Sequence, residues 1–254
     1  MAKKYYVVWQ GRETGIFLDW DTCKKQIDKF AGAKYKSFKT REEAESAFSG
    51  NSSAFMGKAK AKPKKFTGKG LKTYAADEVD NLPVHTKIFT DGGCEPNPGK
   101  AGSGVAVYRD GKLSELWFGL FNPNGTNNTA ELNALHQALL MAEKEIAKKN
   151  SVAIFCDSKY SIQCVTQWAV NWQKKGWIKP GGEIKNLEII KEAFALYTTI
   201  KKSVKVLHVN GHVGVEGNEL ADRMSIHCID TKEVKFAPYK VPSSLKTILA
   251  MRTG

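Results

Sequence analysis

The 254-residue sequence predicts an α/β protein: a mixed sheet with helices packed on its faces, preceded by a flexible linker and a small α+β amino-terminal domain. Three strand-like runs followed by alternating helices and strands indicate the mixed sheet. A separate set of strands and helices fits into the first 49 residues. Between the two sets lies a Lys-, Gly- and Ala-rich stretch with few periodic apolar residues, which is typical of a linker.

Residues 1–49 form the predicted amino-terminal domain. YYVVW and GIFLDW are strand-like, and GRET forms a turn between them. DTCKKQIDKF is a predicted helix with Asp21 or Thr22 as its cap. After a third strand, AKYKSF, the run TREEAESAF has Thr40 and Glu43 at the spacing of a capping box. The domain therefore combines three strands with two helices.

Residues 50–83 form the predicted flexible basic linker. A solvated spacer is its simplest role, and a nonspecific contact with nucleic acid phosphates is the alternative.

Residues 84–236 form the predicted main domain. VHTKIFTD, GSGVAVYR and KLSELWFGL are strands, and Asp110-Gly111 joins the last two in a tight hairpin. TAELNALHQALLMAEKEIAKK repeats apolar residues at steps of three and four, which predicts a long helix. VAIFCD is an apolar strand and SIQCVTQWAVNW a helix, and NLEIIKEAFALYTTIKK and VKVLHVNG add a helix and a strand.

The last predicted helix runs from about Asn218 to Ile229. The tail of residues 237–254 shows no readable role.

The composition indicates the kind of partner and compartment. A net charge of +13 favours a polyanionic partner such as nucleic acid, although a generally basic protein is the alternative. Five cysteines without a CxxC pair argue against a disulfide framework and a zinc ribbon, and for a reducing compartment. Neither a secretory leader nor a membrane-length apolar run is visible, so we expect a cytoplasmic protein without membrane contact.

Four acids stand at the ends of predicted elements: Asp91, Glu131, Asp157 and Asp222. Capping or the helix dipole could explain each one alone, and Asn128 with Glu131 nearly reproduces a capping box. However, VAIFC offers Asp157 no polar partner, and neighbouring strands would bring Asp91 and Asp157 together. Such carboxylates repel each other and raise each other's pKa. Mg²⁺, which prefers oxygen ligands, would remove this conflict, and two ions could promote phosphodiester hydrolysis.

Four motifs in order over residues 89–222, FTDGG, TNNTAEL, FCDS and NGHVGVEGNELAD, resemble the type 1 ribonuclease H family. The resemblance covers residues 84–230 and implies a ribonuclease H-like mixed five-stranded sheet with helices on both faces. It implies an endonuclease that hydrolyses the RNA strand of RNA/DNA hybrids by two-metal-ion catalysis. The expected products carry 5′-phosphate and 3′-hydroxyl ends, and the expected cofactors are two Mg²⁺ ions, with Mn²⁺ able to replace them.

The resemblance also places the family's catalytic residues. The metal-binding acids fall on Asp91, Glu131, Asp157 and Asp222, and the catalytic histidine falls on His212. His212 lies in the Gly-rich loop GHVGVEG, which predicts a mobile and exposed side chain. An ordinary histidine pKa near 6.5 suits a proton shuttle.

Two other histidines, His136 in a helix and His208 in a strand, are interpreted as structural. Asn218 and Glu219 match residues that flank the family's histidine loop.

A ribonuclease H must distinguish RNA from DNA, and the 2′-hydroxyl is the group that differs. The resemblance places contacts to the RNA strand at Asn97, Asn127 and Asn128. Turn formation is the alternative role of these asparagines.

Tryptophans and lysines alternate in WAVNWQKKGWIKPGGEIKN, which is similar to the basic protrusion of bacterial and animal ribonucleases H. The lysines favour a groove for the DNA strand over a purely core role for the tryptophans. The candidate residues for the DNA strand, with the last two in a phosphate pocket, are Trp168, Trp172, Lys174, Lys175, Thr126 and Asn186. Cys94 and Pro180 depart from those family members that have hydroxyl residues there.

The amino-terminal unit resembles the hybrid-binding domain found at the start of many ribonucleases H, through YYVVWQGRETGIFLDWDTCKKQIDKF and AKYKSF. The implied contact residues are Tyr6, Trp20, Tyr35 and Lys36. A core aromatic at the end of a strand is the alternative role of Trp20. A tethered binding module raises the effective concentration of substrate and should favour long hybrids. Weaker binding of duplex RNA and a monomeric state are also expected.

Two other functions remain open at this point. One is a nonenzymatic binder of hybrids or duplex RNA, and the other is a metal nuclease of the same broad fold that acts on DNA.

Overall fold

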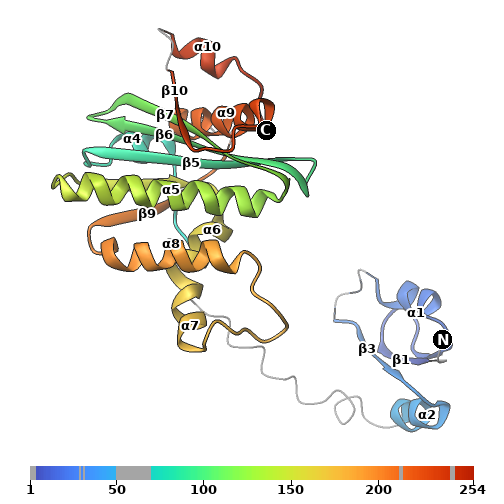
Figure 1. Cartoon of the computed structure of the whole chain (residues 1–254). Coiled ribbons are helices and arrows are strands. Elements are labelled where there is room, and N and C mark those ends of the chain that lie inside the picture. Colours follow the sequence, from blue (N-terminus) through green and yellow to red (C-terminus); the bar gives the residue numbers. More distant parts are fainter. Residues whose placement is uncertain (1–3, 29, 31, 50–69, 212–213, 241–243) are drawn as a thin grey trace. The chain divides into compact units, whose positions relative to one another are not determined.

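Two separate sheets organise the chain, one with strand order β2-β1-β3 and one with strand order β10-β7-β6-β5-β8-β9-β4. The computed structural model describes residues 4–28, 30, 32–49, 70–211, 214–240 and 244–254. Each sheet belongs to its own unit, Met1–Gly68 or Lys69–Gly254 (Figure 1). No described helix is both long and apolar enough to span a bilayer.

The amino-terminal unit has two helices and three strands in its described residues. They are β1 (Tyr5–Gln10), β2 (Gly15–Phe17), α1 (Trp20–Ile27), β3 (Lys34–Phe38) and α2 (Arg41–Ser49). Both β2 and β3 pair antiparallel with β1. Buried Val7 and Val8 of β1 contribute to a small core together with Cys23 of α1 and Ala44 and Ala47 of α2.

The helix caps of this unit test two predictions. Thr40 and Glu43 form the predicted capping box: the Glu43 N–H donates to Thr40 Oγ1 at 3.2 Å, and the Thr40 N–H donates to Glu43 Oε2 at 3.3 Å. The predicted cap of the first helix is wrong. Asp19, in an extended conformation, accepts the Thr22 N–H at 2.8 Å, so α1 begins at Trp20 rather than at Asp21.

The second unit holds the large mixed sheet. Its elements are β4 (Thr73–Tyr74), α4 (Ala76–Asp80), β5 (Thr86–Glu95), β6 (Gly99–Arg109), β7 (Lys112–Gly125), α5 (Asn127–Ala147), β8 (Val152–Cys156), α6 (Lys159–Gln163), the π-helical turn η1 (Cys164–Trp168), α7 (Ala169–Lys174), α8 (Leu187–Ile200), β9 (Val204–Val209), α9 (Glu216–Thr231), β10 (Ala237–Tyr239) and α10 (Leu245–Leu249). Strands β5, β6 and β7 form an antiparallel meander, and β8 and β9 continue the sheet in parallel. The predicted fold class is confirmed, with the five predicted strands at the centre of the sheet.

Two short edge strands extend this sheet beyond the five predicted ones. On one edge β4 pairs in parallel with β9, and on the other β10 pairs antiparallel with β7. Both strands come from segments that the sequence predicted to be linker (50–83) or featureless tail (237–254). The structure differs because apolar residues of these segments pack into the core of the second unit, among them the buried Val79 of α4 and Ile248 of α10. Residues 50–69 of the predicted linker lie outside the described residues.

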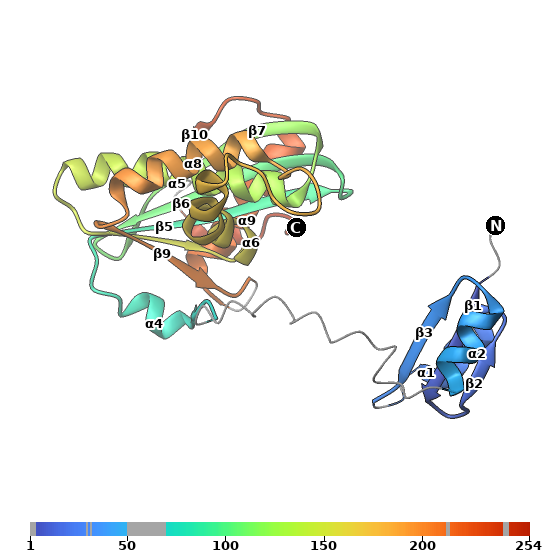
Figure 2. The ribbon, with the colours of Figure 1, turned by 90° about the horizontal axis from the view of Figure 1, so that it is seen from below.

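Helices cover both faces of the large sheet (Figures 1 and 2). Ile88 and Ile154 face a core cluster formed with α5, η1 and α8. Their neighbours Phe89 and Phe155 face the opposite cluster, formed with α9 and α10. The alternation follows from the two-residue period of a strand, and it explains why VAIFC is apolar at every position.

The predicted hairpin between β6 and β7 is confirmed. Asp110 and Gly111 have φ values of +48° and +74°, and Arg109 pairs with Lys112 across the turn. Both central residues therefore adopt the left-handed conformation of a tight two-residue hairpin.

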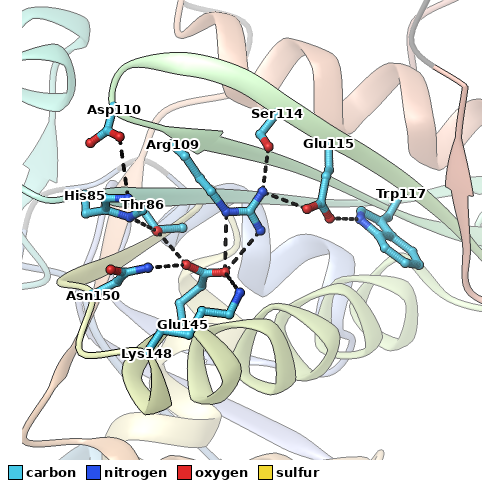
Figure 3. A network of polar contacts seen from close by, with 10 residues as sticks. All are labelled: His85, Thr86, Arg109, Asp110, Ser114, Glu115, Trp117, Glu145, Lys148 and Asn150. Atoms are coloured by element: carbon cyan, nitrogen blue, oxygen red, sulfur yellow. Dashed lines mark hydrogen bonds and ion pairs between the residues drawn. The ribbon is translucent and has the colours of Figure 1, made fainter.

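A buried carboxylate, Glu145, ties the end of α5 to the start of β5 (Figure 3). Its Oε1 accepts from Arg109 Nη2 at 3.1 Å and from Lys148 Nζ at 3.0 Å. Its Oε2 accepts from Asn150 Nδ2 at 2.7 Å and from the Thr86 hydroxyl at 3.3 Å. Burial alone would raise the pKa of Glu145, but these donors outweigh burial and lower the pKa to about 2.

We predict that Glu145→Gln lowers the free energy of unfolding by about 2 kcal/mol at pH 7, because the charge-assisted hydrogen bonds are lost. A lowered folded-state pKa gives stability that is present above the ordinary glutamate pKa of about 4.3 and is lost as the pH falls toward 2. Urea denaturation from pH 7 to pH 2 should therefore show the difference from wild type shrinking below about pH 4.3. Exposed Glu143, on the same helix, provides the control Glu143→Gln. An equal decrease in the free energy of unfolding at all pH values would contradict the assignment of a negative charge to Glu145.

Candidate active site

Strands β5 and β8 bring Asp91 and Asp157 to the same place in the sheet. The two strands are parallel neighbours, with Thr90 opposite Cys156. Asp91 follows Thr90, and Asp157 follows Cys156. The prediction that Asp91 ends its strand is wrong, because pairing with β6 continues β5 to Glu95. The adjacency that the sequence predicted is therefore confirmed by the register.

Glu131 and Asp222 reach the same place from helices on opposite faces of the sheet. A side chain at Gly92 would lie 2.2 Å from the Glu131 backbone nitrogen, and one at Gly104 would lie 2.1 Å from the Ala221 carbonyl oxygen. Because these residues are glycines, α5 and α9 can approach the strands closely enough to deliver their acids. Glu131 lies in the second turn of α5, which begins at Asn127, and not in the first turn as predicted.

Asp222 departs from its predicted position in the last helix. Since α9 begins at Glu216 rather than near Asn218, Asp222 lies in the second turn and not in the first. Interaction with the helix dipole, which is confined to the first turn, therefore does not explain this acid.

The four acids line one cavity of about 230 Å³. Asp91, Glu131 and Asp222 are buried. Burial, together with the charges of Asp157 and Asp222, raises the pKa of Asp91 to about 8. Burial and the charges of Asp91 and Asp157 also raise the pKa of Glu131 well above its usual range. The cluster is thus short of positive charge.

Neutral donors orient two of these carboxylates. The Ser225 hydroxyl donates to Asp91 Oδ2 at 2.8 Å, and Asn218 Nδ2 donates to Asp157 Oδ2 at 3.2 Å. Both donors come from α9. Asn218 was noted from the sequence as a family position, whereas nothing in the sequence singled out Ser225.

Ligand atoms of Glu131, Cys156 and Asp157 lie within 4.8 Å of one another, so these residues could hold a metal ion. Burial raises the pKa of the Cys156 thiol well above its usual range, which leaves the carboxylates as the charged donors. Oxygen-rich donor sets suit hard cations such as Mg²⁺. Cys156 was missed from the sequence because it ends an apolar strand and looks like an ordinary core residue.

Cys94, which the sequence left without a role, lies at the rim of the acid cavity. Its Sγ donates weakly to the carbonyl oxygens of Pro96 at 3.3 Å and Gly125 at 3.6 Å. These contacts link the loop after β5 to the end of β7.

Of the histidines His208 and His212, the structure describes only His208. His212, the predicted catalytic residue, lies outside the described residues. Buried His208 has Nε2 3.1 Å from the Asp157 carbonyl oxygen and Nδ1 2.9 Å from the Thr73 hydroxyl. Since a carbonyl can only accept, Nε2 carries the proton and Nδ1 accepts from Thr73. His208 therefore supports the backbone that carries Asp157, in line with its structural interpretation.

A second cavity, of about 600 Å³, gathers most of the predicted strand-binding residues. Its lining residues are Asn97, Thr126, Asn128, Tyr160, Trp168, Trp172, Lys179, Ile184, Lys185 and Asn186. Tyr160 was not predicted, because it lies outside the Trp- and Lys-rich run. Lys174 and Lys175 are exposed at the end of α7 and do not line this cavity, although the sequence named them as candidates.

Hydrogen bonds fix the polar rim between the two cavities. Thr126 caps α5 by accepting the Thr129 N–H at 3.2 Å, so Asn128 is inside the helix and the suggested cap at Asn128 is wrong. The Thr129 hydroxyl donates to Asn186 Oδ1 at 2.9 Å. Asn97 Oδ1 accepts the Asn127 N–H at 3.3 Å, and Asn127 lines the acid cavity.

The tryptophans of the basic segment divide into two roles. The rings of Trp168 and Trp172 lie 5.8 Å apart and line the second cavity. Trp177 instead packs edge-on against Phe194 of the core, at 6.1 Å.

Three aromatic rings form a row on the amino-terminal unit. The rings of Tyr6 and Trp20 are 5.5 Å apart, and those of Trp20 and Tyr35 are 6.0 Å apart. Trp20 is 42% exposed and Tyr35 is 43% exposed, which contradicts a core role for Trp20. Lys36 Nζ lies 5.8 Å from the Phe38 ring, and Lys36 lines a hollow of about 540 Å³ with Lys39.

A family model described as RNase H matches residues 83–229, more than half of the chain. The chain belongs to the ribonuclease H family. A second model, described as Ribonuclease H1 N-terminal domain, matches residues 4–48 of this ribonuclease H. The predicted family and enzyme class are therefore confirmed.

Relatives of this ribonuclease H include the Ribonuclease H1 of Mus musculus, which is 31% identical over 254 aligned residues and 87% of each chain. The Ribonuclease H of Thermosynechococcus vestitus is 38% identical over 53% of this chain and 82% of its own. Among solved structures, LC9-RNase H1, a type 1 RNase H with the type 2 active-site motif, has a TM-score of 0.51 at 22% identity. That comparison covers 67% of this chain and 83% of the other, and it supports the fold.

We predict that Asp91→Asn stabilises the metal-free ribonuclease H, because it removes one charge from a repelling cluster. Because the folded-state pKa of Asp91 is raised, its ionisation destabilises the folded protein. This destabilisation is absent below the ordinary aspartate pKa of about 3.9 and is fully present once the pH exceeds about 8. The increase in the free energy of unfolding caused by Asp91→Asn should therefore be larger at pH 8 than at pH 5, and on the order of 1 kcal/mol or more at pH 8. Urea denaturation with chelator at both pH values tests this. Equal gains at the two pH values, or a loss, would contradict the assigned repulsion.

Proposed function

We propose that this protein is an endonuclease that hydrolyses the RNA strand of RNA/DNA hybrids with divalent metal ions, leaving 5′-phosphate and 3′-hydroxyl ends. The convergence of four acids on one cavity carries the proposal. A net charge of +13 accompanies this acidic cluster, which suits a polyanionic substrate rather than a cationic one. Relatives named Ribonuclease H1 support the same activity.

The donor set fits two divalent ions. Asp91, Glu131, Asp157 and Asp222 supply carboxylate oxygens. The raised pKa values of Asp91 and Glu131 reflect missing positive charge. Two Mg²⁺ ions, or Mn²⁺ in their place, would supply an activated water and stabilise charge on the leaving oxygen. Ser225 and Asn218 orient Asp91 and Asp157 through neutral hydrogen bonds. His212 is proposed to carry the proton that the departing 3′ oxygen needs.

Separate groups would read the two strands. Asn127 in the acid cavity and Asn97 and Asn128 in the second cavity offer neutral donors and acceptors suited to the 2′-hydroxyl of RNA. Trp168 and Trp172 offer ring faces to the DNA sugars. Thr126 and Asn186 with Lys185 provide polar and positive groups for a DNA phosphate. Lys174 and Lys175 are proposed to attract the backbone from a more exposed position.

The amino-terminal unit is proposed to hold hybrids through Tyr6, Trp20, Tyr35 and Lys36, with weaker binding of duplex RNA. The exposed ring row suits stacking against sugars and bases, and Lys36 suits a phosphate. A monomeric state and a cytoplasmic location complete the proposal.

Substrate class is tested by cleavage of labelled RNA/DNA hybrid, duplex DNA and duplex RNA with Mg²⁺, Mn²⁺ or chelator. We expect cutting of the RNA strand of the hybrid, and only with a divalent ion. Asp91→Asn should lower the rate by about 1,000-fold or more while hybrid affinity stays within about 2-fold, because the acid acts in the reaction and not in binding. Asp110→Asn is the matched control, since an Asn-Gly pair suits the same hairpin.

Preferential cutting of duplex DNA would show that the protein is a DNA nuclease of this fold. Hybrid binding without turnover would show a nonenzymatic binder.

We also predict that Trp20→Ala weakens the affinity for long hybrids about 10-fold, because an exposed aromatic platform is lost. Fluorescence anisotropy with a long and a minimal-length hybrid measures this, and the long hybrid should show the larger effect. Phe48→Ala is the control, since Phe48 is 41% exposed on α2 but does not belong to the ring row. Equal affinity of Trp20→Ala and wild type for the long hybrid would show that Trp20 does not contribute to hybrid binding.

A further inference from the structure

The carboxylate of Asp222 is held by a guanidinium and by a backbone N–H. Its Oδ2 accepts from Nη1 of Arg223, and its Oδ1 accepts from the Gly254 backbone N–H at 3.1 Å. Asp91, in contrast, accepts from the Ser225 hydroxyl. A guanidinium and a residue far along the chain thus fix the orientation of the fourth acid.

Arg223 also connects Asp222 to α10. Its side chain is 9% exposed, and its Nε donates to the Leu249 carbonyl oxygen at 3.3 Å. One planar guanidinium therefore bridges the carboxylate and the end of α10. Because both partners of Arg223 are fixed, the arginine cannot swing away without leaving a buried charge unpaired.

The C-terminal segment, residues 245–254, is anchored at two points along its length. Ile248 is fully buried in the cluster that contains Leu220 and Met224 of α9. Beyond α10, Arg252 pairs with Glu95 of β5 and with Asp230 of α9, the latter at 2.7 Å. The match to the family model ends at residue 229, before this segment begins.

We propose that Arg223 and the C-terminal segment are positioning elements that hold the Asp222 carboxylate toward the other acids, an inference that rests on the proposed metal-dependent function. Left alone, a carboxylate in a repelling cluster would rotate away from its neighbours. Two hydrogen bonds on its two oxygens oppose that rotation. Carboxylates that ligate metals commonly receive such hydrogen bonds, whose loss costs about 10- to 100-fold in metal affinity or activity.

Variants of Arg223 and Arg252 separate positioning from mere stability. Arg223→Met keeps the volume of the stem but removes the charge and all donors, whereas Arg223→Lys keeps the charge but not the planar fork that bridges two acceptors. Arg252→Ala releases the end of the segment from Glu95 and Asp230. Lys246→Ala, which removes an exposed charge from α10, is the charge-matched control.

The full-length variants are compared by three measurements: Mn²⁺ affinity without nucleic acid by electron paramagnetic resonance, kcat and KM on the hybrid at saturating Mg²⁺, and urea denaturation. We expect Arg223→Met to weaken Mn²⁺ binding and lower kcat by about 10-fold each, with KM for the hybrid within about 2-fold. Arg223→Lys should recover part of the loss in Mn²⁺ affinity and part of the loss in kcat. Arg252→Ala should lower Mn²⁺ affinity and kcat by about 3-fold each. Lys246→Ala should match wild type.

Several results would overturn the inference. Wild-type metal affinity and kcat in Arg223→Met would show that the arginine does not position Asp222. Higher kcat in Arg252→Ala would show that the segment restricts access instead. If Mn²⁺ affinity and kcat fall only in proportion to the fraction of unfolded protein, the arginines have a purely structural role. If wild type itself fails to cut hybrids, the proposed function fails, while Mn²⁺ binding still tests the positioning of Asp222.

Discussion

Repulsion among four clustered carboxylates is the constraint on which the rest of the catalytic unit depends. Asp91, Glu131, Asp157 and Asp222 share a cavity of about 230 Å³, and burial together with the neighbouring charges raises the pKa of Asp91 to about 8. Buried carboxylates that repel one another lower the stability of a folded protein when no positive charge balances them. The surrounding fold must therefore hold each acid in place, and the proposed divalent ions would complete the charge balance.

Close packing of backbone holds the acids together. Two parallel strands place Asp91 and Asp157 side by side, and Gly92 and Gly104 let α5 and α9 approach the sheet without a side chain between them. Hydrogen bonds from α9 then orient the carboxylates, since Asn218, Arg223 and Ser225 all lie on that helix. Helix α9 thus supplies both an acid and the donors that hold three of the acids. The C-terminal segment in turn supports α9 through Leu249 and Arg252.

The sequence predicted the five central strands because their apolar runs and turn dipeptides are local signals, as Asp110-Gly111 shows. It also predicted the four acids that meet in one cavity, because motif order reveals them, although only Asp157 directly follows the end of a strand. It did not predict the edge strands β4 and β10, which depend on pairing with partners far along the chain. Ser225, Cys156 and Arg252 were missed for the same reason: their contacts come from tertiary packing, and an isolated Ser, Cys or Arg carries no local pattern.

We propose that a divalent cation relieves the repulsion in this acid cluster. The direct test is the free energy of unfolding at pH 8 as a function of Mg²⁺ concentration, at constant ionic strength, for wild type and for the double variant Asp91→Asn, Asp157→Asn. We predict that the free energy of unfolding of wild type rises with Mg²⁺ by RT ln(1 + [Mg²⁺]/Kd), and that the double variant shows no such rise. Equal Mg²⁺ dependence of the two proteins, or no dependence in wild type, would contradict it.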